Sequence, residues 1–311
     1  MSAGIKVFAP ASVANVACGF DILGFALEHP GDEIIARIVD TPGLRITKIT
    51  GTKGKNLPYD IEKNTAGYAA KQLLQYLGET KLGIELEIHK KMPFGSGLGS
   101  SAASAVGGVM AINELLQRPL EKRQLLQFAV QGEQIADGAY HADNVAPSLI
   151  GGIILIRSNA ELDVHRLPVP KGLYAVVVYP KVEILTKDAR NILSKEVELP
   201  KVIQQTGNLG GLIVGLYNAD YDLISRALQD VIIEPQRSGL IPHFYKVKEV
   251  ALQKGALGCS ISGAGPSIFA LCMNSYIAEN VGEAMQTIFN DNRIESELFI
   301  SSINQEGAVK L

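Results

Sequence analysis

Alternating hydrophobic and polar residues divide the first half of the chain into strands and helices. Residues 84–88 alternate with period two, as a half-buried strand does, and residues 33–39 show the same pattern. Between them, Asn64 precedes an amphipathic run that stops at Gly78, so we expect a helix with a capping residue at each end. Similar patterns predict two further helices, at residues 100–116 and 119–136.

The second half has a different order of elements. An apolar run predicts a strand at residues 174–179, and several helical segments follow it. Two strands joined by a glycine turn, a helix and a last strand are then predicted at residues 257–261, 267–271, 277–289 and 297–300. This order is that of a split β-α-β-β-α-β unit with additional helices. The polar, proline-containing residues 157–171 interrupt the pattern, so we divide the chain into two domains, residues 1–160 and 161–311.

The composition is that of an ordinary globular protein. Hydrophobic residues make up 47% and charged residues 20%, which argues against a disordered chain, a collagen or a coiled coil. The 29 basic and 32 acidic residues form no run of like charge, so a nucleic-acid partner is not indicated. The three cysteines are far apart, which favours neither a disulfide framework nor a zinc site. Without a basic stretch followed by an apolar one, or an apolar run of membrane-spanning length, we expect a cytoplasmic protein.

Glycine is over-represented, with 31 residues in 311, and the glycines are clustered. Residues 93–103 read P-F-G-S-G-L-G-S-S-A-A, directly after a predicted strand and before a predicted helix. Glycines let backbone N–H groups approach an anion closely, and the helix start adds unpaired N–H groups and a positive dipole end. Ser100 and Ser101 offer hydroxyls to a phosphate or its cation. The G-K-[ST] ending of a Walker A loop is missing, and a loop that only joins the strand to the helix is the alternative.

Glu133 and a polar cluster after it are the next candidates for chemistry. Glu133 lies in the predicted helix, and His141, Asp143 and Asn144 follow in the segment H-A-D-N-V-A-P. Each alone is more typical of a solvated helix residue or a turn. Beside a phosphate loop, Glu133 becomes a candidate ligand for Mg²⁺, because nucleotide sites bind Mg²⁺ through one or two protein oxygens together with the phosphates.

Five further polar residues are ambiguous. Asn15 and Asp21 interrupt an apolar stretch, so they are either local caps or ligands for a polar group. Thr186 is a candidate helix N-cap, and Arg190 and Arg237 are more typical of surface charges. A second glycine turn, C-S-I-S-G-A-G-P-S at residues 259–267, is explained equally well by a tight hairpin or by the close approach of another backbone or a ligand.

Three motifs in the same order resemble those of the GHMP kinases. They read P-A-S-V-A-N-V-A-C-G-F-D, P-F-G-S-G-L-G-S-S-A-A and G-C-S-I-S-G-A-G-P-S, and they span nearly the whole chain. Within that family the chain is most similar to the homoserine kinases, on the segments H-A-D-N-V-A-P-S-L-I-G-G, T-K-D-A-R, E-P-Q-R and I-N-Q-E-G-A. The resemblance implies an α+β, two-domain fold: an α/β N-terminal domain like domain 2 of ribosomal protein S5, and a ferredoxin-like α+β C-terminal domain.

The resemblance also implies an activity and a set of site residues. It implies transfer of the γ-phosphoryl group of ATP to the hydroxyl of L-homoserine, with Mg²⁺, in threonine biosynthesis. The ATP-binding residues would be Asn64, Pro93, Gly95, Ser96, Gly97, Leu98, Gly99, Ser100, Ser101 and Gly263. The metal ligands would be Ser101 and Glu133. The substrate-binding residues would be Asn15, Asp21, His141, Asn144, Thr186, Arg190 and Arg237, of which Asn144 and Arg190 would be catalytic.

The charges of these residues suit an amino acid. An arginine can bind a carboxylate through two parallel hydrogen bonds, and Asp21 can bind an ammonium group. Mevalonate kinases have an aspartate resembling a catalytic base near the position of Asn144, and an amide cannot take a proton. The alternatives are a kinase for another small alcohol such as mevalonate, a non-catalytic ligand-binding member, and a hydrolase using Glu133, His141 and Asp143. We expect no membrane partner, and a homodimer is compatible with the sequence.

Overall fold

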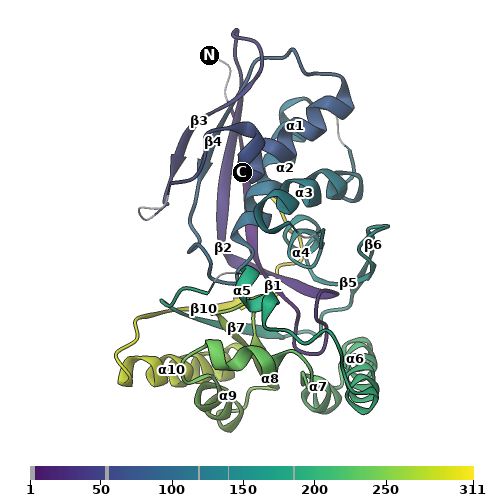
Figure 1. Ribbon diagram of the computed structural model, residues 1–311, viewed down its shortest axis with the longest axis vertical. Helices are drawn as coiled ribbons and strands as arrows, with labels where there is room; N and C mark the ends of the chain where they lie inside the picture. The colour runs from purple at the N-terminus through teal and green to yellow at the C-terminus, as the bar shows by residue number, and fades with distance from the viewer. Residues whose placement is uncertain (1–3, 53–55, 118–119, 139, 185) are drawn as a thin grey trace.

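The structure is a computed structural model that describes residues 4–52, 56–117, 120–138, 140–184 and 186–311. Its larger, upper sheet follows the order β11-β1-β2-β4-β3, with β5 paired to β2 and β6 paired to β5 (Figure 1). Neighbouring strands are antiparallel except β3 and β4, which are parallel. The strands are β1 (Ile5–Ala14), β2 (Leu23–Ile38), β3 (Leu44–Thr50), β4 (Ile84–His89), β5 (Ile153–Ser158), β6 (Asp163–Leu167) and β11 (Val309–Lys310).

Helices cover one face of this sheet: α2 and α4 pack on its strands, and α1 and α3 lie mainly on the outer side of α2 (Figure 1). The segment that forms α2 is rich in small residues because it is packed on both sides. A Cβ atom at Gly107 would collide with the side chain of Ile34, and one at Gly108 would collide with the carbonyl oxygen of Ala66. The elements of this layer are η1 (Ile61–Lys63), α1 (Thr65–Leu77), α2 (Ser100–Leu115), α3 (Lys122–Asp137) and α4 (Val145–Ile150).

The caps predicted for α1 are present. The Oδ1 atom of Asn64 accepts hydrogen bonds from the N–H groups of Ala66 at 3.1 Å and Gly67 at 3.2 Å. Gly78 ends the helix with a φ of 74°, in the left-handed region that glycine adopts without strain. Helix α3 begins at Lys122 rather than at the predicted residue 119, which lies outside the described residues, and ends before Gly138 as predicted.

The second sheet has the order β10-β7-β9-β8, and all its neighbouring pairs are antiparallel. This is the arrangement of a split β-α-β-β-α-β unit, as the order of elements predicts. Its strands are β7 (Tyr174–Pro180), β8 (Gly258–Ile261), β9 (Ile268–Cys272) and β10 (Ser296–Ser302). The helices of this half are α5 (Thr186–Asn191), α6 (Leu199–Asn218), α7 (Tyr221–Ala227), α8 (Glu234–Arg237), η2 (Ser238–Leu240), α9 (Phe244–Gln253) and α10 (Ser275–Asp291).

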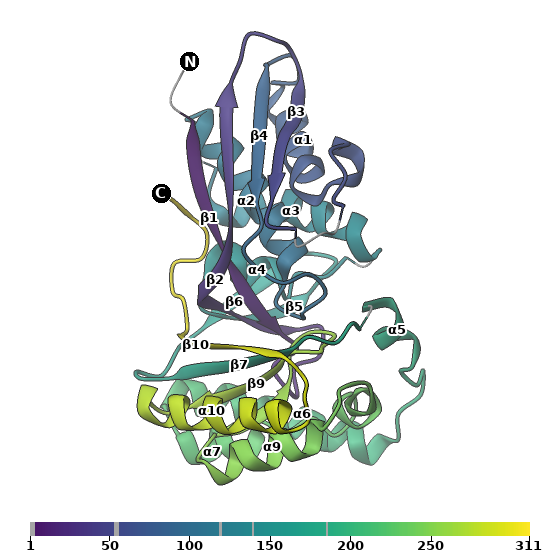
Figure 2. The same ribbon diagram turned by 90° about the vertical axis from the view of Figure 1, so that its left-hand side faces the viewer.

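Both faces of the second sheet are buried. Ala175 and Val177 of β7 belong to a hydrophobic core that continues into the first sheet, and Val176 and Val178 belong to a second core that includes α9 and α10. Figure 2 shows this sheet as a layer between the body above and these helices below. A strand buried on both faces is hydrophobic throughout, which explains the continuous apolar run of its sequence.

Two strands of the first sheet follow the predicted domain boundary. That boundary, at residue 160, falls between β5 and β6, which form an antiparallel hairpin. The last strand, β11, pairs with β1. Strands from both sides of residue 160 thus belong to the same sheet. The division of the chain at this residue stays a prediction. No helix among the described residues is both long enough and apolar enough to cross a membrane.

Candidate active site

The glycine-rich loop joins β4 to α2 at the junction of the two halves. Gly95, Gly97 and Gly99 have φ values of 61°, 79° and 65°, in the region that favours glycine. No side chain caps the first turn of α2 at the described residues, so its N–H groups are available to an anion. The hydroxyl oxygen of Ser100 is buried without a hydrogen-bond partner among the described residues. This hydroxyl is therefore a hydrogen-bonding group that the described residues leave unused beside the loop.

The second glycine turn packs directly on this loop. The hydroxyl of Ser262 donates a hydrogen bond to the carbonyl oxygen of Gly97 at 2.6 Å, and the N–H of Ser267 donates to the carbonyl oxygen of Ser96 at 3.2 Å. A Cβ atom at Gly97 would collide with the carbonyl oxygen of Ser262. The turn is thus a hairpin whose Gly263 and Gly265 have φ values of 58° and 83°, in the region that favours glycine. The close backbone approach requires glycine at Gly97 of the loop and not at the glycines of the turn.

The remaining predicted ATP-binding residues lie around the loop. The side chain of Leu98 is fully buried in the core, so only its backbone can face a ligand. Asn64 is buried, and besides capping α1 it donates from Nδ2 to the carbonyl oxygen of Pro58 at 2.9 Å. The carbonyl oxygen of Gly263 accepts hydrogen bonds from Asn15 at 2.7 Å and from Arg237 at 3.1 Å.

Three cavities adjoin one another along this junction. The first, next to α1, is lined by residues that include Asn64, Lys90, Phe94 and Ser101. The second lies at the loop and shares Phe94 and Ser101 with the first. The third shares four residues with the second, Glu133, Asn144, Gly263 and Ala264, and is otherwise lined by Asn15, Asp21, His141, Asp143, Arg190 and Arg237. Pro93 lines a further cavity that also includes Phe94.

The third cavity contains six of the seven residues predicted to bind the substrate. The exception is Thr186, whose side chain lies outside the described residues. Helix α5 begins at Thr186 itself, so the residue is the first of the helix and not the N-cap that its sequence indicates.

Asp21 is the centre of a charged cluster. Its carboxylate accepts two hydrogen bonds from Arg190, at 2.9 and 3.1 Å, and lies 3.6 Å from Nδ1 of His141. The Oδ1 atom of Asn15 accepts a hydrogen bond from the N–H of Asp21 at 3.0 Å. Asn15 and Asp21 have φ values of 73° and 60°, a conformation more common for these residue types than for other non-glycine residues. Both therefore act as local structural partners and as cavity-lining groups.

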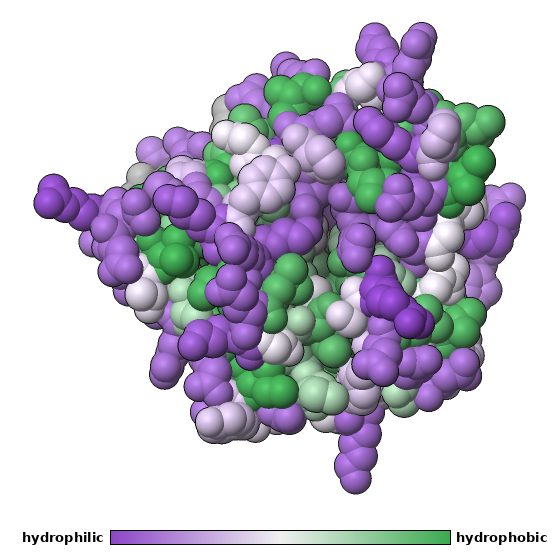
Figure 3. Space-filling view, turned by 90° about the horizontal axis from the view of Figure 1, so that it is seen from below, coloured by the Kyte–Doolittle hydropathy of each residue, from purple (hydrophilic) through white to green (hydrophobic). Residues whose placement is uncertain are grey.

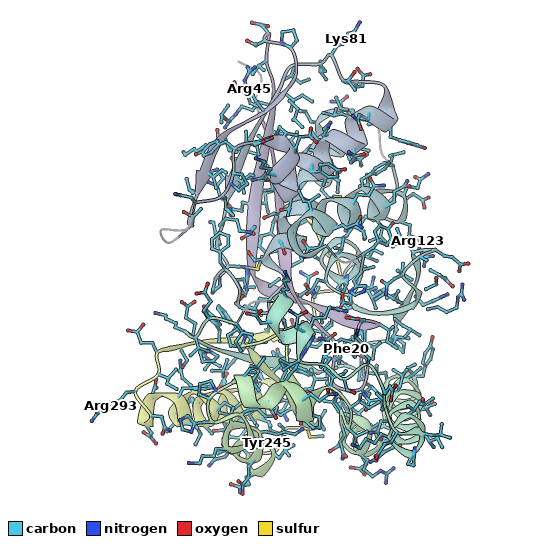
Figure 4. The ribbon with its side chains drawn as sticks, in the orientation of Figure 1. Phe20, Arg45, Lys81, Arg123, Tyr245 and Arg293 are labelled. Atoms are coloured by element: carbon cyan, nitrogen blue, oxygen red, sulfur yellow. The ribbon has the colours of Figure 1, made fainter. Side chains whose placement is uncertain are left out.

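Arg237 is buried, with 4% of its surface exposed, which contradicts its interpretation as a surface charge. Nε donates to the carbonyl oxygen of Ala189 at 2.9 Å, and Nη1 donates to that of Gly263. Phe20 lies at the junction of the two halves (Figure 4), with the guanidinium carbons of Arg237 and Arg190 at 5.0 and 5.6 Å from its ring centre. Burial, and then the charge of Arg190, lower the pKa of Arg237.

Two oxygen-bearing side chains meet between the loop and α3. The hydroxyl of Ser101 donates to Oε1 of Glu133 at 2.7 Å. Gly132, which precedes Glu133, lets α3 approach α1, because a Cβ atom there would collide with Ala69. Nearby, the hydroxyl of Ser12 donates to Oδ1 of Asn144 at 2.9 Å. Among the described residues, no group of three or more His, Cys, Asp or Glu side chains could hold a metal ion.

Asp143 lines the same cavity and is buried. Desolvation, and then the negative charge of Asp21, raise the pKa of its carboxyl group to about 7. In the unfolded chain a carboxyl of this type releases its proton near pH 4. Between about pH 4 and 7 the folded protein therefore binds more protons than the unfolded chain, so the free energy of unfolding falls as the pH rises through this window.

Replacing Asp143 with asparagine is expected to remove this pH dependence. Relative to the original protein, Asp143→Asn should gain up to about 1.4 kcal/mol in unfolding free energy for each pH unit between 4 and 7. Chemical denaturation at several pH values measures the difference. The exposed Asp222→Asn is the control for the loss of one carboxyl group. A constant difference between Asp143→Asn and the original protein across this range contradicts the expectation.

Several residues at the site have no clear signal in the sequence. Ser12 and Phe20 lie inside the first motif but are neither charged nor glycine, and Ser262 is one of several serines in the second turn. Each matters through a contact with a residue that is distant in sequence. Ser12 donates a hydrogen bond to the carboxamide of Asn144, and Ser262 donates one to the carbonyl oxygen of Gly97.

Family models match both halves of this fold. The family described as GHMP kinases N terminal domain matches residues 64–152, and GHMP kinases C terminal matches residues 212–291. The chain belongs to the GHMP kinase family.

Its relatives specify the type of kinase. Homoserine kinases of Chlorobium phaeobacteroides (strain BS1) and Chlorobaculum tepidum are 46% and 47% identical to it, each over 97% of this chain and over 97% and 96% of their own lengths. The crystal structure of homoserine kinase from Cytophaga hutchinsonii is 54% identical and covers 100% of this chain and 98% of its own, with a TM-score of 0.97. A mevalonate kinase structure, at 16% identity, 98% and 100% coverage and a TM-score of 0.72, shares the fold.

Proposed function

We propose that this chain transfers the γ-phosphoryl group of ATP to the side-chain hydroxyl of L-homoserine, giving O-phospho-L-homoserine and ADP. One observation carries the proposal. A cavity with opposite charges, those of Asp21 and of Arg190 and Arg237, adjoins a loop of glycines at a helix start. The names of the full-length relatives support the same acceptor.

The proposal assigns the charged cluster to the two ends of the amino acid. Asp21 binds the ammonium group, and Arg190 and Arg237 bind the carboxylate. In the structure Asp21 and Arg190 form an ion pair with each other. Binding of the substrate replaces this ion pair by one between Asp21 and the ammonium group and one between Arg190 and the carboxylate. Asn15, His141 and Thr186 complete this part of the site.

The loop and the start of α2 bind the phosphates of ATP. Backbone N–H groups around Gly95, Gly97 and Gly99 surround the anion, together with the hydroxyl of Ser100. The buried hydroxyl of Ser96 donates to the carbonyl oxygen of Pro93, so Ser96 contributes through its backbone, and the hydroxyl of Ser101 faces Glu133. Asn64 contacts the nucleotide base. The cavity beside Asn64 adjoins the cavity at the loop, which supports a nucleotide running from one to the other.

Ser101 and Glu133 suit Mg²⁺. A carboxylate and a hydroxyl within 2.7 Å of each other beside the phosphate loop are oxygen donors of the kind that Mg²⁺ takes together with phosphate oxygens. When bound there, Mg²⁺ neutralises charge on the transferred phosphoryl group.

Positioning supplies most of the acceleration in phosphoryl transfer, because the transition state is loose. Asn144, oriented by Ser12, aligns the acceptor hydroxyl, and Arg190 balances the developing charge. The amide of Asn144 cannot accept a proton, and the proposal assigns the hydroxyl proton to a phosphate oxygen.

An ADP-release assay with L-homoserine, L-threonine, L-serine and mevalonate tests the proposal. We expect the highest kcat/KM with L-homoserine. Mevalonate has no ammonium group for Asp21, serine is one carbon shorter, and threonine carries a secondary hydroxyl. Preference for mevalonate would point to another kinase of the family, and no ADP release with any acceptor would point to a non-catalytic member.

We also propose that two copies associate through α6. Leu199 and Ile203 at its N-terminal end are 69% and 64% exposed, and Val214 and Tyr217 at its C-terminal end are also exposed. Residues 202–217 include no charged residue, which is unusual for an exposed helix and typical of an interface centre. Figure 3 shows hydrophobic patches on the lower face of the molecule. Helices α6 to α10 lie at this end of the molecule (Figure 1).

In an antiparallel pairing centred between Gly207 and Gly210, Ile203 of one copy faces Val214 of the other. Ile203→Glu is therefore expected to give monomers, and Ile203→Glu with Val214→Lys is expected to restore the dimer by pairing opposite charges. Sedimentation velocity measures the mass, with Tyr276→Glu, an exposed residue of α10, as control. The same mass for all four proteins would contradict the proposal.

A further inference from the structure

Both ends of the glycine loop are attached to one buried carboxylate. Asp32, in β2, is fully buried, and its Oδ1 atom accepts hydrogen bonds from the N–H groups of Lys91 at 2.8 Å and Met92 at 3.3 Å. These two residues lead from β4 into the loop. The residues that follow the end of β4 are thereby held against β2 of the first sheet.

Lys90 connects the same carboxylate to the other end of the loop. Its Nζ forms an ion pair with Asp32, and it donates to the carbonyl oxygen of Ser100 and to the hydroxyl of Ser104, both at 2.7 Å. Ser100 and Ser104 belong to the first turns of α2. Only 1% of the Lys90 side chain is exposed. The start of the helix is therefore fixed to the same point as the end of the strand.

Stability alone is a weak explanation for this ion pair. Removing two charges from water is costly, and well-packed neutral residues often replace a buried ion pair without loss of stability. A buried charge with several well-placed partners does, however, specify one arrangement of those partners. Here the partners are the two ends of the glycine loop, whose N–H groups have to converge on the phosphates that they bind. Lys90 also lines the cavity beside Asn64 and lies 5.5 Å from the ring centre of Phe94 in the loop.

We infer that Asp32 and Lys90 are positioning residues for the ATP phosphates. They hold the end of β4 and the start of α2 at the separation that keeps the N–H groups of the loop convergent. They act through the loop and not on the substrate that accepts the phosphoryl group. The cavity lined by Asp21 and Arg237 includes neither Asp32 nor Lys90. This inference rests on the proposed function only in taking ATP as the ligand of the loop.

The double variant Asp32→Asn with Lys90→Met tests the inference. It removes both charges together, so no unpaired charge stays buried, and its thermal unfolding midpoint should be close to that of the original protein. We expect the Kd and the KM for ATP to rise by about tenfold, the factor for one or two lost hydrogen bonds, with the KM for L-homoserine within about twofold. Arg157→Met with Asp163→Asn, an exposed ion pair on the β5–β6 hairpin, is the matched control.

Direct titration with ATP separates this inference from the proposed function. If the original protein binds ATP but does not phosphorylate homoserine, the proposed acceptor is wrong. The affinity of the double variant for ATP then still tests whether Asp32 and Lys90 position the loop. Unchanged ATP affinity in a folded double variant overturns the inference. If the double variant does not fold, Ser104→Ala decides, because it removes one acceptor of Lys90 and leaves both charges. A rise of about two- to threefold in the Kd for ATP then supports the inference, and an unchanged Kd overturns it.

Discussion

Glu133→Gln is expected to lower kcat by about a hundredfold, the upper range for the loss of one group that tunes a metal site. Glutamine has the same shape and still offers an oxygen to the hydroxyl of Ser101, so the contact at 2.7 Å and the fold are retained. The negative charge that favours Mg²⁺ is lost. Excess Mg²⁺ should therefore restore part of the activity by mass action.

Steady-state kinetics over a series of Mg²⁺ concentrations measures this effect. Glu279→Gln, an exposed residue of α10, is the matched control for the loss of one carboxylate. The midpoint of the Mg²⁺ dependence should move to higher concentration for Glu133→Gln only. A midpoint equal to that of the original protein would remove Glu133 from the metal site, even if kcat were lower.

Elements with signals at their own ends were predictable from the sequence. Asn64 and Gly78 frame α1 because an amide side chain at one end and a left-handed glycine at the other satisfy backbone groups locally. Helix α4 (Val145–Ile150) was not predicted. It follows polar residues typical of a turn and contains Pro147, which is tolerated in the first turn of a helix. Strand β6 was missed as well, because its five residues carry no regular alternation.

The chemical types at the site were predictable, but their partners were not. The contact between Ser262 and Gly97 joins residues 165 apart, and the ion pair of Asp32 and Lys90 joins residues 58 apart. Such contacts depend on how the two sheets meet, and neither residue type nor spacing carries that information. Arg237 shows the same limit, because its burial results from the packing of Phe20 and the second turn around it.

Arg237→Met is expected to raise the KM for L-homoserine by about ten- to a hundredfold, which corresponds to 1.5–3 kcal/mol for a hydrogen bond to a charged group. Methionine fills much of the buried volume without the charge, and it also removes the hydrogen bonds to the carbonyl oxygens of Ala189 and Gly263. The KM for ATP should rise by less. Arg237 also holds the carbonyl of Gly263, whose turn contacts the loop at Gly97.

Kinetics with each substrate varied in turn separates the two effects, with Arg226→Met, an exposed residue of α7, as control. The proposed assignment has Arg237 binding the carboxylate of L-homoserine directly and affecting ATP only through the turn, so the ratio of the two changes in KM tests that assignment. A much larger change for L-homoserine supports contact with the carboxylate. Equal changes for both substrates would mean that Arg237 serves only to hold the turn against the loop.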